Sequence, residues 1–226
     1  MMTSLTRSLG TLTVAFAMAA CASQSTANRG AAPPTPAQTQ GEGAAVARAK
    51  ADSIRNPYTA ADVHFMQGMI GHHSQAIAMA AWAPTHGASA SVRTLAERII
   101  NAQQDEISTM QTWLGDRHQT VPAAGPMKTM MNGKEEEMLM PGMLTAAQMH
   151  QLDLAKGPDF DRLFLTDMIQ HHRGAVSMVK DLFGTYGAGQ DELIFKFASD
   201  VNVDQTTEIA RMERMLNSFA LEKSAQ

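Results

Sequence analysis

The chain has 226 residues, 44% of them hydrophobic, which is enough to bury the core of one domain or of two small ones. Its 18 Lys and Arg against 22 Asp and Glu give a net charge of −4 without a basic stripe, which excludes binding dominated by nucleic-acid phosphates. The 18 methionines are unusual beside 5% aromatic residues, because well-specified cores use flexible Met side chains sparingly.

Residues 1–20 are predicted to be an export signal. Arg7 precedes the apolar stretch "LGTLTVAFAMAA", which is too short for a stable membrane anchor. The stretch ends at "MAAC", which resembles a bacterial lipobox with Met18 where Leu is usual. Cys21, the only cysteine, would then be the lipidated first residue of the mature protein, and an ordinary cleaved signal is the alternative. Both interpretations place the protein outside the cytoplasm. In the lipobox interpretation it is a lipoprotein of the cell envelope, periplasm-facing or extracellular, and contacts the membrane only through the lipid anchor.

The segment after Cys21 is rich in Ala, Ser, Thr, Pro, Gln and Gly. Such a composition lacks the apolar residues that offset the entropy of ordering. Residues 21–55 are therefore predicted to be a flexible tether, and residues 56–226 to form the folded domain.

The folded part contains an internal duplication. The stretch "DVHFMQGMIGHHSQAIAMA" aligns with "DRLFLTDMIQHHRGAVSMV", which begins 99 positions later, and the alignment places one adjacent His pair on the other. A second pair of segments, "QQDEISTMQTWL" and "DQTTEIARMERML", matches Glu106 to Glu208 and Met110 to Met212. Each half of the domain is therefore one copy of the same unit.

Both copies have a helical pattern, because their apolar residues recur at spacings of three and four. Pro84 and Gly184 lie where the first helix of each copy should end. We expect hairpins over residues 57–115 and 158–220, each with one apolar stripe. Packing these stripes against each other gives an all-α fold, a ferritin-like four-helix bundle. Met66, Met110, Met212 and Met215 are predicted core residues, and His86, His118 and His150 loop or surface residues.

Residues 116–157 link the two hairpins. The segment "LTAAQMHQLDLAKG" predicts a short helix capped by Thr145 with Gln148. The segment before it has no usable periodicity and is rich in methionine, at Met127, Met130, Met131, Met138, Met140 and Met143. These side chains either cover an apolar surface or form a secondary, low-affinity copper site helped by the neighbouring acidic residues.

Each His-His pair lies near methionines on the same face of its helix. Imidazole suits copper, zinc and iron, whereas the soft thioether favours Cu(I). In an oxidising envelope a thioether also binds without deprotonation, and the sequence offers no Cys cluster for zinc and no Glu-x-x-His pair for di-iron. The predicted ligand is therefore a copper ion, held by His72, His73, His171, His172, Met69, Met79, Met168 and Met178. Because imidazole protonates near pH ~6.5, the histidine share of the affinity should fade through that range, whereas thioether binding should persist.

Two other functions remain open: a metal-free structural or protein-interaction module, and a redox-active metal enzyme. The sequence has no nucleophile and base arrangement and no Gly-rich phosphate loop, so no catalytic residue is predicted. No acidic partner for the histidines is predicted beyond Asp62 and Asp161 at the helix starts. A homodimer, or a partner that receives copper, is compatible with this pattern.

The stretches "FMQGMIGHHSQAIAMA" and "MPGMLTAAQMHQLDLAKGPDFDRLFLTDMIQHHRGAVSMV" resemble the bacterial family DUF305, a domain of unknown function, from about Pro57 to Leu216. The resemblance implies a ferritin-like helical fold. Some members of the family are exported copper-binding proteins linked to copper resistance, which implies that the two His pairs and the nearby methionines are ligands. It does not imply ferroxidase chemistry, because the carboxylate ligands for that reaction are missing.

Overall fold

The computed structural model describes residues 44, 58–123, 125, 127–131 and 134–224, with only the backbone for residues 127–131, 134–137 and 222–224. The predicted export signal, Cys21 and all of the predicted tether except residue 44 lie outside the described residues. So do the side chains of Met127, Met130 and Met131.

The first hairpin consists of α2 (Ala60–Ala81) and α3 (Ala90–Asp116). Helix α2 starts with a capping box, because the hydroxyl of Thr59 accepts from the Asp62 N–H while the Asp62 carboxylate accepts from the Thr59 N–H at 2.7 Å. Ser89 caps α3. Two otherwise marginal helix starts are thereby fixed by their own sequence.

The second hairpin consists of α5 (Gly157–Gly184) and α6 (Glu192–Ser224). The two hairpins are tied together at their ends. Asp161, one turn after the start of α5 and therefore not in its first turn as predicted, accepts from the backbone N–H of Ser89 at 3.1 Å, and Asp62 accepts from the backbone N–H of Gly189 at 2.7 Å. Each of the two aspartates therefore holds the turn of the opposite hairpin, and Asp62 also caps its own helix.

Between the hairpins lie β1 (Met127–Met131), β2 (Lys134–Met138) and α4 (Ala146–Leu154). The capping box of Thr145 and Gln148 in α4 is confirmed. The strands pair antiparallel, with Met127 opposite Met138. The periodicity of this segment does not predict the two strands. Its sequence does contain Asn132-Gly133 between them, the dipeptide most typical of two-residue hairpin turns.

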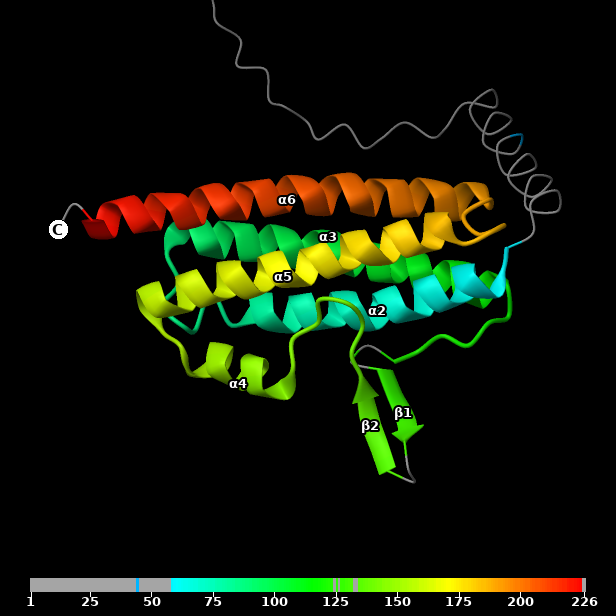
Figure 1. Cartoon of the computed structure of the whole chain (residues 1–226), viewed down its shortest axis with the longest axis horizontal. Coiled ribbons are helices and arrows are strands. Elements are labelled where there is room, and N and C mark those ends of the chain that lie inside the picture. Colours follow the sequence, from blue (N-terminus) through cyan, green and yellow to red (C-terminus); the bar gives the residue numbers. More distant parts are fainter. Residues whose placement is uncertain (1–43, 45–57, 124, 126, 132–133, 225–226) are drawn as a thin grey trace, which may run out of the picture. The chain divides into compact units, whose positions relative to one another are not determined.

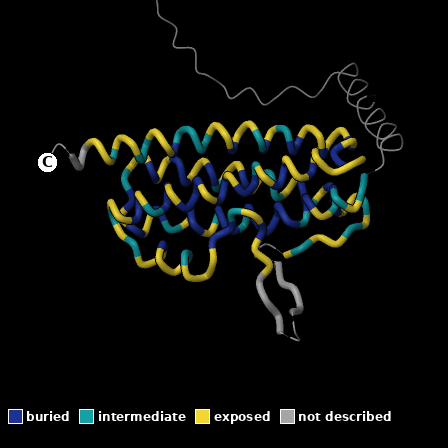
Figure 2. The backbone as a smooth tube through the Cα atoms, in the orientation of Figure 1, coloured by how far each residue is buried: buried dark blue, intermediate teal, exposed yellow. Residues whose placement is uncertain are grey.

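Helix α2 packs against α3 and α5, and α5 packs against α6, so that the four long helices lie side by side (Figure 1). The buried residues follow the inward faces of these helices (Figure 2). Met66, Met110 and Met212 are fully buried, as predicted, and Met215 is half-buried. The all-α class is confirmed, whereas the ferritin-like bundle stays a prediction. Among the described helices, none combines the length and the apolar character that crossing a membrane requires.

Candidate metal centre

The two His pairs meet in the interior between α2 and α5. The rings of His72 and His171 lie with their centroids 3.8 Å apart at a tilt of 40°, and both side chains are fully buried. The ring centroid of His73 lies 6.3 Å from that of His72, and the ring centroid of His172 lies 6.3 Å from that of His171. Both outer side chains are also fully buried. The four imidazoles therefore form one continuous histidine row that crosses from one half of the duplication to the other.

A carboxylate stands at each end of the histidine row. His73 Nε2 lies 2.7 Å from Glu106 Oε2 of α3, and His172 Nε2 lies 2.7 Å from Glu208 Oε2 of α6. The second contact has hydrogen-bond geometry, while the first is less well aligned. The prediction that these histidines lack an acidic partner is wrong. The duplication itself carried the signal, because it matches Glu106 to Glu208.

The inner histidines differ in their partners. His72 Nε2 lies 3.0 Å from the backbone oxygen of Pro141, and a carbonyl only accepts, so this nitrogen carries the proton. Among the described residues, neither ring nitrogen of His171 has a hydrogen-bond partner, and the Nδ1 atoms of His72, His73 and His172 also have none. With Nε2–H directed to oxygen, the Nδ1 atom holds a free lone pair. Metal-binding histidines characteristically donate the other N–H to a carboxylate or carbonyl in this way.

Burial keeps the inner histidines neutral. It lowers the pKa of His72 to about 3, with further lowering by the neighbouring rings of His73 and His172. Burial likewise lowers the pKa of His171 well below its usual value, and the rings of His72 and His172 add to the effect. At neutral pH these nitrogens are therefore available to a metal without losing a proton.

A turn of the linker covers the histidine row. In this linker turn, residues 140–143, Met143 N donates to Met140 O at 3.1 Å, with Pro141 and Gly142 (φ 78°) between them. Proline followed by a glycine of positive φ is the pattern of a type II turn. The turn packs so closely on α5 that a methyl group on Gly174 would lie 1.8 Å from the Pro141 oxygen. The backbone of the linker is thus part of the site.

Gln75 of α2 fixes the next linker residue, Leu144. Its side-chain oxygen accepts from Leu144 N at 2.7 Å, and its amide donates to Leu144 O at 3.0 Å. Both ends of a buried amide are therefore used to hold one backbone unit. The linker is attached to α2 by this pair and to α5 by the close approach at Gly174.

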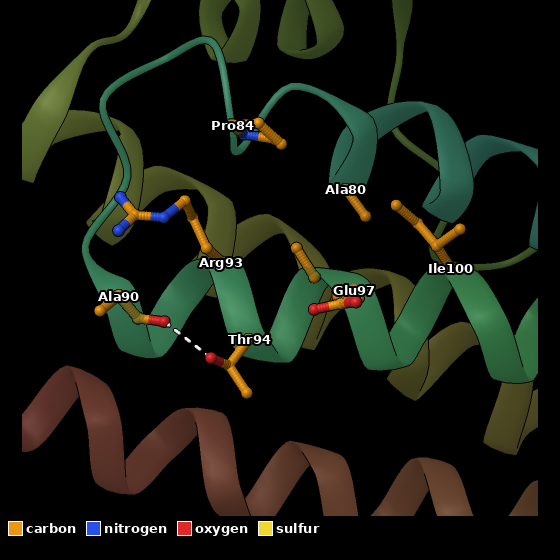
Figure 3. A pocket seen from close by; sticks show the side chains of 8 residues that line it. Ala80, Pro84, Ala90, Arg93, Thr94, Glu97 and Ile100 are labelled. Atoms are coloured by element: carbon orange, nitrogen blue, oxygen red, sulfur yellow. Dashed lines mark hydrogen bonds between the residues drawn. The ribbon is translucent and has the colours of Figure 1, made fainter.

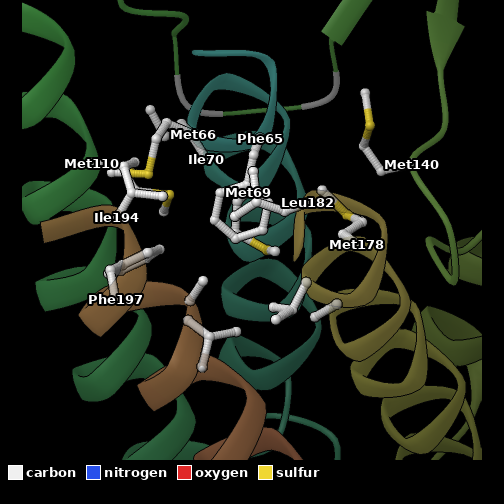
Figure 4. Packing of buried hydrophobic residues seen from close by; sticks show 14 of the residues in the cluster. Phe65, Met66, Met69, Ile70, Met110, Met140, Met178, Leu182, Ile194 and Phe197 are labelled. Atoms are coloured by element: carbon white, nitrogen blue, oxygen red, sulfur yellow. The ribbon is translucent and has the colours of Figure 1, made fainter. Parts of the chain in front are cut away.

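The predicted methionine ligands do not gather in one place. All four helix methionines are buried, but Met69 and Met178 belong to one apolar cluster and Met79 and Met168 to another. The cluster of Met69 and Met178 also contains Met140 and Met143 of the linker turn. Figure 4 shows Met69, Met140 and Met178 in this cluster with Phe65 and Leu182. Met138 is exposed. The structure thus brings the linker methionines Met140 and Met143 to one of the two apolar clusters, which contains residues of both halves.

The other histidines lie elsewhere. His86 lies in the turn between α2 and α3, as a predicted loop residue, but it is not at the surface, because it is only 5% exposed and its Nε2 lies 2.8 Å from the Asp153 backbone oxygen. It is buried because the linker returns across the α2–α3 turn. His118 and His150 are exposed, as predicted, and so is His64. Counting only His, Cys, Asp and Glu in the described part of the chain, no group of three or more is arranged to hold a metal ion.

A hollow of about 460 Å³ lies between the end of α2 and the start of α3 (Figure 3). It is lined by Ala80, Pro84, Ala90, Arg93, Thr94, Ala96, Glu97 and Ile100. The Thr94 hydroxyl donates to the Ala90 backbone oxygen at 3.0 Å, within its own helix. This hollow contains neither His nor Met, so it does not compete with the histidine row as a site for a soft metal ion.

The helices and the buried histidine row define an all-helical protein with a polar interior. Residues 62–216 match the family model described as "Domain of unknown function (DUF305)". Because this match spans most of the chain, the protein belongs to the DUF305 family.

Solved structures agree with this assignment. A DUF305 fragment from Deinococcus radiodurans is 28% identical, with a TM-score of 0.60 over 72% of this chain and 99% of that one. CopM in its Cu(I)-bound form is 28% identical, with a TM-score of 0.54 over 70% of this chain and 96% of that one, and CopM also has Cu(II)-bound, Ag-bound and apo structures. A mimivirus protein, "Uncharacterized protein L153", is 37% identical over 65 residues, 29% of this chain, and the match spans 43% of that curated relative.

Proposed function

We propose that this protein is an exported, lipid-anchored copper protein whose ferritin-like four-helix bundle binds Cu(I) at the histidine row. It lowers the free metal concentration by sequestration or transfers the ion to a partner, and it carries out no catalytic step. The observation that carries the proposal is the set of four buried Nδ1 atoms without partners between α2 and α5. Unpaired buried polar atoms are costly, and a soft metal ion would pair them.

The donor set fits a monovalent copper ion. The inner histidines, His72 and His171, offer the nitrogens of neutral imidazoles, which suit copper. A single positive charge is also less costly to bury in an apolar interior than a double one, because the desolvation penalty rises steeply with charge. Glu106 and Glu208 sit beside the outer histidines, where their negative charge offsets that of a bound ion.

The comparisons support the same direction. The CopM structures similar to this chain contain Cu(I), Cu(II) or Ag. The resemblance extends over most of both chains at an identity near that of the other DUF305 structures. Export and lipid anchoring rest on the N-terminal sequence alone, through its apolar stretch and the lipobox-like "MAAC".

The test is an anaerobic Cu(I) competition titration of the full chain beside the variant His171→Phe. This substitution keeps an aromatic ring and removes two nitrogens that have no hydrogen-bond partner, so the metal-free protein should stay folded and at least equally stable. We expect Cu(I) affinity to fall at least about 100-fold. His150→Phe, at an exposed histidine outside the row, should change nothing.

Circular dichroism must show equal helicity for the three proteins. Equal Cu(I) affinity in the wild type and the His171→Phe variant would remove the histidine row from metal binding. The row would then be a structural feature of a metal-free module.

A further inference from the structure

A cavity of about 240 Å³ opens beside the histidine row, between α2, α5 and the linker turn. We call it the methionine cavity. The lining residues that matter here are His64, Met140, Pro141, Met178 and Asp181, beside the apolar Phe65 and Leu182. Its walls therefore combine two thioethers, one imidazole and one carboxylate.

The two thioethers lie next to each other over Gly68. A methyl group added to this glycine would lie 3.2 Å from Met140 Sδ and 3.4 Å from the terminal methyl of Met178. Gly68 thus leaves the space in which both side chains end. Met140 and Met178 are each 8% exposed, whereas Met66, Met69 and Met110 of the same cluster are fully buried. Together with Phe197, the two methionines are the most exposed members of the cluster, and Figure 4 shows them on the same side of it.

The other lining residues extend the cavity in two directions. His64 and Asp181 are exposed and lie on α2 and α5 at its outer edge. On α2, His64, Gly68 and His72 follow one another at spacings of four residues, so they share one face of the helix. On α5, Asp181, Met178, Gly174 and His171 follow at spacings of three and four. Both helices therefore lead from the cavity to the inner histidines, and Pro141 connects the two places because its oxygen contacts His72.

We propose that the methionine cavity is a second, surface-accessible site for a soft monovalent ion, Cu(I) or Ag(I), and that it loads the histidine row. Met140, Met178 and His64 are the ligands, and Asp181 attracts the cation to the opening. Loading exchanges sulfur ligands for the neutral nitrogens of His72 and His171. It needs no redox step and releases no proton. The loading role rests on the proposed function, whereas the site itself does not.

The first experiment uses Ag(I), which is redox-inert, and the full chain with ¹³C-labelled methionine methyl groups. In the His171→Phe background, Ag(I) should shift the NMR signals of Met140 and Met178 and leave those of Met66 and Met110 unchanged. Native mass spectrometry should count one Ag(I) fewer after Met140→Leu with Met178→Leu. The control pair is Met66→Leu with Met110→Leu, buried in the same cluster, and it should keep the ion. Met and Leu exchange costs little in a core, so both pairs should fold.

A second measurement tests loading. In the otherwise native chain, Met140→Leu with Met178→Leu should slow Cu(I) transfer to the histidine row about tenfold at unchanged equilibrium affinity of the row. Unshifted Met140 and Met178 signals and an unchanged Ag(I) count would overturn the site. Normal loading kinetics in the double variant would overturn the loading role. Both results differ from failure of the histidine row, which would appear as His171→Phe having no effect on Cu(I) affinity.

Discussion

The two halves of the duplication share their polar interior. Each first helix carries an adjacent His pair whose outer member faces a glutamate of the second helix, Glu106 or Glu208. One turn before each glutamate is a buried glutamine, Gln103 or Gln205, with at least one unpaired side-chain atom. These groups are costly to bury, yet both copies have them. The duplication therefore preserved a site as well as a fold.

The halves differ where the linker touches them. Gly68 of the first copy corresponds to Asp167 of the second, Gln75 to Gly174, and His64 to Leu163. The first-copy residues line the methionine cavity, border it or hold Leu144, and Gly174 makes room for Pro141. Since the chain has only one linker, it gives His72 a backbone partner and leaves His171 without one. A single asymmetric segment thus makes two equivalent histidines chemically unequal.

Acid should have the largest effect on the metal-free protein, and both copies should contribute to it. The folded-state pKa values of His72 and His171 lie below their unfolded values, so the unfolded state binds more protons and stability falls as pH falls below about 6.5. Burial raises the pKa of Asp167 to about 6. The folded state therefore binds more protons at this carboxyl between pH 6 and about 4, so Asp167 alone would make stability rise as the pH falls. Because two histidines outweigh one aspartate, the free energy of unfolding should fall as the pH falls from 6 to 4, by roughly 1 kcal/mol per pH unit.

Urea unfolding at several pH values measures this dependence. Because Asp167 exists only in the second copy, Asp167→Asn should remove the opposing contribution and roughly double the slope in that range. A stability independent of pH between 6 and 4 in this variant would contradict neutral burial of the inner histidines. The same lowered pKa values also shift the onset of proton competition for copper below the pH ~6.5 expected from unperturbed imidazole.

Gly174→Ala should break the asymmetric contact. The new methyl group cannot coexist with the Pro141 oxygen, so the linker turn must move away from α5 and from His72. We expect a loss of about 2–3 kcal/mol in the free energy of unfolding, measured with urea.

Two controls calibrate that loss. Gly184→Ala, at the end of the same helix with no neighbouring atom within 4 Å, should stabilise by about 0.5–1 kcal/mol. Gln75→Ala, the matching position in the first copy, should cost about 1–2 kcal/mol through two lost hydrogen bonds. Equal changes in the free energy of unfolding for Gly174→Ala and Gly184→Ala would mean that the linker turn does not depend on the close approach of Pro141 to Gly174.

Glu106→Gln and Glu208→Gln test the contact between outer histidine and glutamate that the two halves share. Each removes a carboxylate that orients one outer histidine, so each should weaken Cu(I) binding about tenfold, or about 1.4 kcal/mol. Competition titration of the two variants measures this. A loss in one variant only would assign the metal to that half of the histidine row, and no loss in either would contradict the orienting role.

Local patterns predict much of this fold and part of the site. The apolar spacing, the repeat and the capping boxes act within a few residues, and they predict the helical hairpins and the chemistry of the two His pairs. Contacts set by packing are harder to predict. Glu106 is conspicuous in the repeat, but its approach to His73 depends on the relative rotation of α2 and α3.

The contacts of the linker are even harder to predict from local patterns. His72 and Pro141 are 69 residues apart, and His86 and Asp153 are 67 apart. Neither pair belongs to a periodic pattern, so only the docked backbone brings its members together. Likewise, the composition of the linker indicates its methionines but not that Met140 ends beside Met178 over Gly68.

The position of the linker turn also constrains the order of folding. Its backbone contacts both α2 and α5, so it can close only after the two hairpins have docked. Such late contacts are weakly formed in the transition state, and changes to them alter the unfolding rate more than the folding rate. We therefore expect the linker turn to be the last part of the domain to form and the first to be released.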